Sequence, residues 1–173
     1  MEQARHWTPA GLGPKGPGTF AAIGGSNTCG ACDISGRVAC NQTSFAKLTF
    51  DALKSLARVH YFQNGGLGAM GPQLAAACSN KFAPAGTKFA TVEYLPNLGY
   101  VNDDVGELAA MELLLSVLRR RGARAVLINL LPSARMQRFA SCRDGTVGCT
   151  TRGHIERLDA ALRALAANYS TPT

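Results

Sequence analysis

Short apolar segments alternate along the chain with segments in which apolar residues recur at helical spacing. The apolar segments have the continuous character of strands buried on both faces, and they cover residues 19–23, 59–62, 89–95 and 123–131. The helical spacing predicts helices over residues 45–56, 72–82, 108–118 and 155–165. Strands and helices in this alternating order predict an α/β fold, with a parallel sheet covered by helices on both faces.

The length of 173 residues and the composition suit one globular domain. Apolar residues make up 46% of the chain and charged residues 17%, which excludes wholesale disorder. Residues 1–18 are rich in glycine and proline and are expected to form a flexible lead-in. The folded domain is then expected to cover residues 19–173.

The net charge of +7 does not by itself indicate a nucleic-acid partner. The densest basic run, Arg119 to Arg121 with Arg124, closes a predicted helix, where cations meet the partial negative charge of the last carbonyls. We therefore expect a solvated helix end and no nucleic-acid binding. No apolar run approaches the length of about 18 residues that a membrane span needs, and no secretory signal segment is recognisable.

Six cysteines are many for this length and point to disulfides in an oxidising compartment. They are Cys29, Cys32, Cys40, Cys78, Cys142 and Cys149, and the sequence leaves their pairing open. Asparagine sequons at Asn41 and Asn168 agree with a secreted glycoprotein. Two alternatives fit less well. A zinc site at Cys29 and Cys32 lacks a second close pair of ligands. A thioredoxin-like redox pair is expected at the start of a helix, and Cys29 and Cys32 do not precede a clear helical pattern.

Polar and glycine-rich residues collect where the predicted strands end, which is where parallel sheets bind ligands. The first strand ends in Gly24-Gly25-Ser26-Asn27, so that Ser26 is either a nucleophile or an ordinary turn residue. The second strand ends in the glycine-rich segment 64–69, whose backbone N–H groups can face a developing oxyanion. After the third strand, the amide of Asn97 can donate to the same anion; Asn102 competes for this role but also suits a helix cap.

Taken in order, these three segments resemble the blocks of the SGNH (GDSL-type) hydrolases. The third block, Val92-Glu93-Tyr94-x-x-Asn97, is similar to that of a eukaryotic branch of this family. The resemblance implies a three-layer α/β/α sandwich of flavodoxin-like type and hydrolysis of acyl or acetyl esters of lipids or sugars. It also implies Ser26 as the nucleophile, Gly68 (or Ala69, one residue on) as a backbone oxyanion donor, and Asn97 as the side-chain donor.

The chain departs from this family in its last block, Asp-x-x-His, which supplies the base and the carboxylate that orients it. No such sequence is present, and the histidines are His6, His60 and His154. His6 lies in the lead-in, His60 begins a strand, and His154 begins the last predicted helix, which precedes the final strand in the family. We therefore expect a truncated chain that lacks the last strand and helix of the fold and has little or no activity.

The sequence is compatible with three functions. The first is an SGNH-type serine esterase acting on a small-molecule, lipid or carbohydrate ester, with no cofactor and no metal. The alternative is a catalytically inactive, glycan-binding relative in the secretory pathway, which the missing Asp-x-x-His favours. A flavodoxin-like protein that binds a nucleotide or cofactor is the weakest of the three. The sequence has neither of the glycine motifs that bind phosphate, Gly-x-x-x-x-Gly-Lys-Ser/Thr and Gly-x-Gly-x-x-Gly after a strand. The substrate and the oligomeric state are left open.

Overall fold

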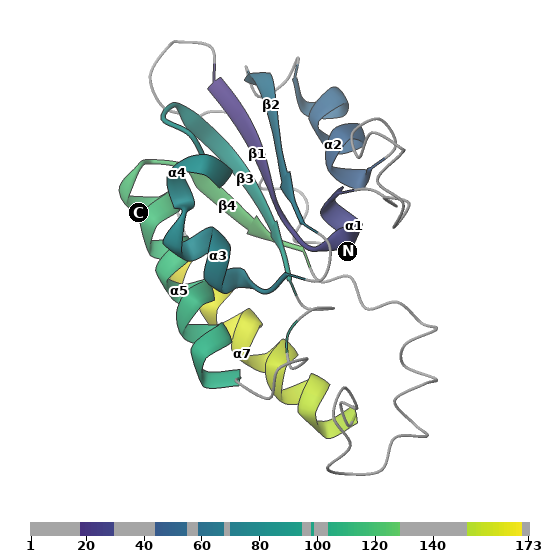
Figure 1. The fold of residues 1–173 in the computed structure, drawn as a ribbon, viewed down its shortest axis with the longest axis vertical. Helices are drawn as coiled ribbons and strands as arrows, with labels where there is room; N and C mark the ends of the chain where they lie inside the picture. The colour runs from purple at the N-terminus through teal and green to yellow at the C-terminus, as the bar shows by residue number, and fades with distance from the viewer. Residues whose placement is uncertain are drawn as a thin grey trace.

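A four-stranded, all-parallel sheet forms the centre of the fold. The computed structural model describes residues 18–29, 44–54, 59–67, 70–94, 98, 104–128 and 152–170. Within them the strands are β1 (Gly18–Gly24), β2 (Val59–Gly66), β3 (Thr87–Glu93) and β4 (Arg124–Leu127). Their order across the sheet is β2-β1-β3-β4, and every neighbouring pair is parallel (Figure 1). The predicted α/β class with a parallel sheet is confirmed.

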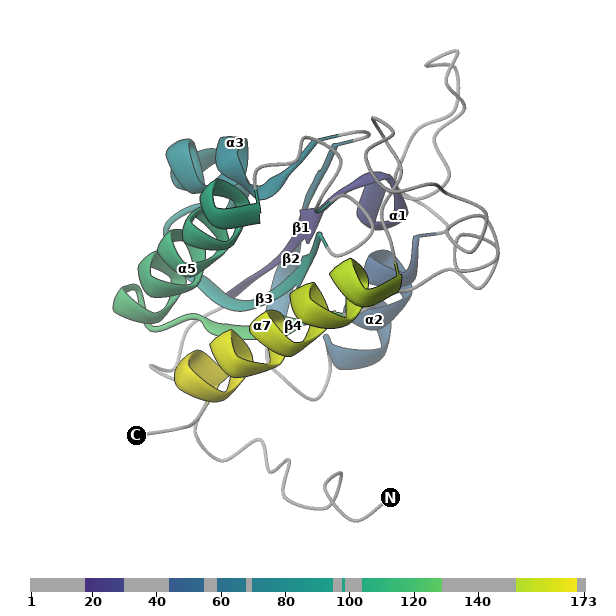
Figure 2. The same ribbon diagram turned by 90° about the horizontal axis from the view of Figure 1, so that it is seen from below.

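Helices cover both faces of the sheet, as the continuous apolar strands require. The described helices are α1 (Ser26–Cys29), α2 (Phe45–Leu53), α3 (Pro72–Ala77), α4 (Ser79–Phe82), α5 (Asp104–Arg120) and α7 (Arg152–Ser170). Figure 2 shows α1 and α2 on one side of the sheet and α3 and α5 on the other. Helix α7 runs beside α5 at the β4 side of the molecule, where the Tyr169 hydroxyl donates to Glu112 Oε1 (3.3 Å). None of the helices described is both long and apolar enough to cross a membrane.

The alternation of side chains along β1 divides the core into two clusters. Phe20 and Ala22 face α2, and the Phe20 ring lies 5.7 Å from that of Phe89 and 6.1 Å from that of Phe50, measured between centroids. Ala21 and Ile23 face the opposite cluster, which is built from α3, α4, α5 and α7. Because both faces of β1 are covered, its sequence is continuously apolar and shows no alternation.

Several element boundaries differ from those predicted. The helix predicted over 72–82 is interrupted at Cys78, whose backbone (φ −109°, ψ 34°) leaves the helical region between α3 and α4. The short helix α1 directly after Gly25 was not among the predicted helices. Strand β3 begins and ends two residues earlier than predicted, because Thr87 pairs with Thr19 while Tyr94 leaves the ladder.

Candidate active site

The first segment of the candidate site is the turn that leads from β1 into α1 and carries Ser26. The N–H of Gly25 donates to the main-chain oxygen of Glu93 (3.1 Å), and the N–H of Cys29 donates back to Gly25 (3.1 Å). Ser26 is therefore the first residue of a single helical turn, directly beyond the carboxyl end of the strand. Gly24 must be glycine here, because a β-carbon would overlap the Thr28 side chain and the Glu93 carbonyl.

The end of β2 packs directly against this turn. The N–H of Leu67 donates to Gly24 O (2.9 Å), and the Asn64 amide donates to Cys29 O (3.4 Å). The N–H of Gly66 is held by Asn64 Oδ1 (2.9 Å), and a β-carbon on Gly66 would meet the Cys29 Cα at 2.6 Å. The absence of a side chain at Gly66 therefore lets β2 approach the backbone of α1 closely.

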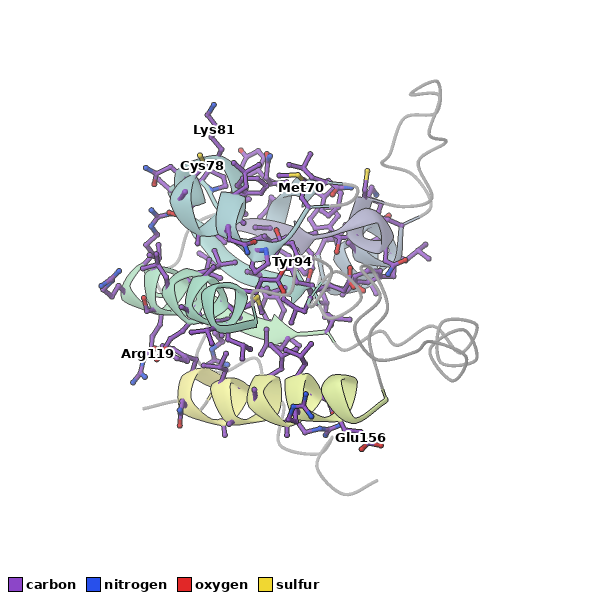
Figure 3. The ribbon with its side chains drawn as sticks, turned by 60° about the horizontal axis from the view of Figure 1, so that its bottom comes forward. Met70, Cys78, Lys81, Tyr94, Arg119 and Glu156 are labelled. Atoms are coloured by element: carbon purple, nitrogen blue, oxygen red, sulfur yellow. The ribbon has the colours of Figure 1, made fainter. Side chains whose placement is uncertain are left out.

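The end of β3 lies on the other side of the same turn. Glu93 and Tyr94 are buried, and the N–H of Leu98 donates to Tyr94 O (3.0 Å). In Figure 3 the Tyr94 side chain lies in the interior, whereas Lys81, Arg119 and Glu156 project outwards. The third block is thus adjacent to the first through the pairing of β1 with β3.

The predicted site residues are only partly within the described structure. Ser26 has its backbone placed in α1, but its side chain lies outside the description. Gly68, Ala69, Asn97 and the competing Asn102 also lie outside it. Their assignment as nucleophile and oxyanion donors stays a prediction, although the strand ends that carry the three blocks lie side by side.

The histidines follow the expectation where they are described. His60 is exposed and is the second residue of β2, at the amino edge of the sheet, opposite the strand ends that carry the three blocks. His154 is in the first turn of α7, with its side chain outside the description, and His6 lies outside the described residues. Of the cysteines, Cys78 is a free, half-buried thiol between α3 and α4. Cys32, Cys40, Cys142 and Cys149 lie outside the described residues.

The most unusual electrostatic feature is a buried carboxyl group on β3. Glu93 is fully buried, and burial raises its pKa from 4.5 to about 7. Hydrogen bonds from the side chains of Thr28 and Asn27 and from the N–H groups of Gly25 and Thr28 act in the opposite direction. Burial, and to a lesser extent the Glu93 charge, raises the pKa of Tyr94 as well, so its hydroxyl is neutral at physiological pH.

A second buried carboxyl group approaches the segment after β2. Glu107 is fully buried in the first part of α5, and a β-carbon on Gly71 would come within 3.3 Å of its Oε1. Sequence reasoning did not single out Thr28 or Glu107, and it included Glu93 only as part of the third block. The available signal was a glutamate at the end of an otherwise apolar strand, which burial makes costly unless donors face it.

A cavity of about 230 Å³ lies on the other face of β3. Val92 and Tyr94 line it, and they point away from the face of Glu93 because neighbouring strand residues alternate. Its remaining lining comes from α5, the end of β4 and one face of α7: Met111, Leu127, Ile128, Asp159, Leu162, Arg163 and Ala166. Over the described residues, no group of three or more His, Cys, Asp or Glu side chains could hold a metal ion.

The parallel sheet with glycine-rich turns at its carboxyl edge defines an open α/β domain with a candidate site at that edge. The solved structures that are similar to this chain include esterases. The chain is similar to AlinE4, an SGNH-hydrolase family esterase, with a TM-score of 0.60 and 15% identity. The alignment covers 91% of this chain and 75% of AlinE4.

A second similar structure is a catalytic mutant of Axe2, an acetylxylan esterase from Geobacillus stearothermophilus. It has a TM-score of 0.59 and 12% identity, and the alignment covers 91% of this chain and 75% of that one. No known family profile matches the sequence, and no curated protein matches it. The chain has the fold of the SGNH hydrolases, as its three sequence blocks predicted.

Proposed function

We propose that the chain is an SGNH-type serine hydrolase that acts on an acyl or acetyl ester of a lipid or carbohydrate. Ser26 Oγ attacks the ester carbonyl, and the resulting oxyanion accepts hydrogen bonds from the N–H groups of Ser26 and Gly68 and from the Asn97 amide. The alcohol then leaves with a proton, and water releases the acyl group from Ser26. We assign no base, because the sequence holds no Asp-x-x-His.

One observation carries this proposal. Gly24, two residues before Ser26, pairs with Gly66 across one side of β1 and with Glu93 across the other. Gly68 follows two residues after Gly66, and Asn97 four residues after Glu93. Since neighbouring strands are about 4.8 Å apart, the three short extensions start from one small region of the sheet edge.

Modification of Ser26 by a fluorophosphonate tests the nucleophile without requiring full turnover. The wild-type protein should be labelled at Ser26, as located by peptide mass spectrometry, and Ser26→Ala should not be labelled. Hydrolysis of p-nitrophenyl acetate, even where it is slow in the wild type, should be slower in the same variant. Ser116→Ala is the matched control, because its hydroxyl only donates to Leu113 O within α5 (2.8 Å).

The comparison of substrates addresses the ester class. An acetyl ester, an octanoyl ester and acetylated xylan separate an acetyl esterase from an enzyme for longer acyl chains. Equal rates for wild type and Ser26→Ala, together with no labelling of Ser26, would contradict the proposal.

A glycan-binding protein without turnover is the second candidate. Its support is the position of His60, which is exposed at the amino edge of the sheet, far from the segments that carry the three blocks. Saturable binding on a glycan array by a protein that is neither labelled at Ser26 nor hydrolytic would favour it. A protein that hydrolyses esters and binds no glycan would exclude it.

We also propose that the protein is a disulfide-bonded glycoprotein of the secretory pathway. The support is the six cysteines and the sequons at Asn41 and Asn168, of which Asn168 is exposed on α7. After expression in a eukaryotic secretory system, digestion with an N-glycosidase should lower the apparent mass. Peptide mapping without reductant should find cysteine-linked peptides, and Cys78 should react with a maleimide after unfolding without reduction.

A further inference from the structure

Among the residues that the structure describes, Glu93 is the one buried acid that faces the turn carrying Ser26. It lies on the same face of β3 as Phe89 and Thr91, and this face is turned towards α1 and α2. The Thr28 hydroxyl donates to Glu93 Oε2 (3.1 Å), and both side chains are fully buried. The bond joins residues 65 positions apart in the sequence, so it links β3 to α1 and does not serve local helix formation.

The contacts around Glu93 are donors from one short segment. Besides the Thr28 hydroxyl, the Asn27 side chain and the N–H groups of Gly25 and Thr28 act on its carboxyl group. Glu93 Oε1 has no hydrogen-bond partner among the described residues, so the bond between the Thr28 hydroxyl and Oε2 is the side-chain attachment of α1 to β3.

The main chain of Glu93 holds the same segment a second time. Its carbonyl oxygen accepts the N–H of Gly25, and the space between this oxygen and Thr28 has no room for a β-carbon on Gly24. Two separate attachments, one through the backbone and one through the side chain, fix both ends of the turn. A turn fixed at both ends has little freedom to move the residue between them.

We propose that Glu93 is a positioning residue, which acts through Thr28 and Gly25 to fix the turn from which the Ser26 side chain starts. This inference rests on the proposed function of Ser26 as a nucleophile. Nucleophilic attack depends on placement to within a fraction of an ångström, and a displacement of about 1 Å costs on the order of a hundred-fold in rate. The placement by Glu93 thus contributes to rate and not to substrate affinity.

Thr28→Val tests the side-chain attachment, since valine keeps the shape of threonine and removes the hydroxyl. The rate of Ser26 labelling by a fluorophosphonate, and kcat for an activated ester, should fall about ten- to hundred-fold with KM within about twofold. Glu93→Gln should lower the labelling rate and kcat to a similar extent as Thr28→Val, because the glutamine side chain places an NH₂ group, itself a donor, opposite other donors. Thr28→Ser keeps the hydroxyl and should stay within about threefold of wild type.

Thr91→Val is the matched control for the same chemical change. Thr91 is also buried, lies on the same face of β3, and its hydroxyl has no hydrogen-bond partner in the part of the chain described. Labelling of Ser26 in this variant should equal that of wild type. Amide hydrogen exchange gives a readout independent of activity: the peptide containing residues 24–29 should exchange at least about tenfold faster in Thr28→Val and unchanged in Thr91→Val.

The outcomes separate this inference from the proposed function. Slower labelling and faster exchange in Thr28→Val, with rescue by serine, support the positioning role. Equal labelling in wild type and Thr28→Val overturns it while the nucleophile stands. No labelling of Ser26 in the wild type contradicts the proposed function, and the positioning role with it, whatever the exchange data show.

Discussion

A carboxyl group with no exposed surface is costly, and Glu93 shows how a single side chain meets that cost. Burial favours its neutral form, whereas the Thr28 and Asn27 side chains and two N–H groups favour the charged form. Burial has the larger effect, so the pKa rises to about 7. The charge of Glu93 therefore changes near physiological pH, although its side chain has no exposed surface.

This raised pKa predicts a specific dependence of stability on pH. Between pH 4.5 and 7 the unfolded chain has lost the Glu93 proton while the folded chain keeps it, so ionisation opposes folding as the pH rises. Relative to Glu93→Gln, which does not titrate, the wild type should lose about 3 kcal/mol of unfolding free energy over this range. Urea unfolding of both proteins from pH 4 to pH 8 measures the difference.

Glu156→Gln is the control for removing a carboxylate elsewhere. Glu156 is exposed on α7. The difference in unfolding free energy between wild type and Glu156→Gln should therefore change much less with pH than the difference for Glu93→Gln. If the difference in unfolding free energy between wild type and Glu93→Gln stayed constant from pH 4 to pH 8, this result would contradict the raised pKa of Glu93.

At this scale the sequence supports the candidate residues but not the interactions that hold them. Ser26 and Asn97 can be singled out because their residue types suit ester chemistry and follow predicted strands. The bond between Thr28 and Glu93 cannot be read from the sequence, because 65 positions separate its partners. Only the pairing of β1 with β3 brings the two residues together.

At the scale of elements, the end of β1 and the start of α1 are packed so closely that side-chain volume decides which residues are allowed. A β-carbon on Gly24 would come within 2.9 Å of Thr28 Cβ and even closer to the Glu93 carbonyl oxygen. Both neighbours are backbone or fully buried side chain, so neither can move aside without disturbing a strand. Glycine at this position is a packing requirement, as well as an aid to the turn.

Gly24→Ala should therefore destabilise the protein by about 3 kcal/mol or more and displace the turn that carries Ser26. Urea unfolding measures the first effect, and fluorophosphonate labelling of the folded fraction measures the second. The control is Gly122→Asn, at φ +75° with open space around it, which should cost about 1 kcal/mol or less because asparagine tolerates this backbone region. Equal stability of Gly24→Ala and wild type would contradict the packing described here.

The element boundaries show which local signals are overridden by distant contacts. The helical pattern over residues 72–82 continues through Cys78, yet the helix breaks there. The Arg121 side chain, from the turn after α5, donates to Ala83 O (2.9 Å) and to the Asn80 and Ser79 side chains, and so holds α4 in a direction of its own. The pattern predicted that a helix exists in this region, but the contact with Arg121 was not visible in it.

For the whole molecule, the apolar pattern was sufficient to predict the architecture. Continuous apolar strands indicated a sheet buried on both faces, and alternation with helices indicated parallel pairing; both are confirmed. The strand order and the division of helices between the two faces did not follow from the pattern. They depend on which faces of α2 and α5 complement the sheet, and a single sequence does not contain that information directly.

The cavity between α7 and the sheet reduces the packing contacts of the α7 side chains that line it. Leu162 is buried against α5 and β4 but also lines the cavity of about 230 Å³, whereas Leu114 of α5 is fully buried in the same cluster. A side chain that borders empty space makes fewer contacts, so its removal costs less than that of a fully packed leucine. The two leucines therefore form a matched pair for measuring how well α7 is packed.

Leu114→Ala should lower the unfolding free energy by about 4 kcal/mol, and Leu162→Ala by about 2 to 3 kcal/mol, as measured by urea unfolding. Leu113→Ala is the control on the same helix as Leu114; its side chain is 49% exposed, and the loss should stay below about 1 kcal/mol. The order of the three losses follows from contact with neighbouring atoms alone, because all three changes remove the same group. A loss for Leu162→Ala as small as that for Leu113→Ala would mean that α7 contributes little to the core in solution, and the fold would then depend on β1 to β4 with α2 to α5.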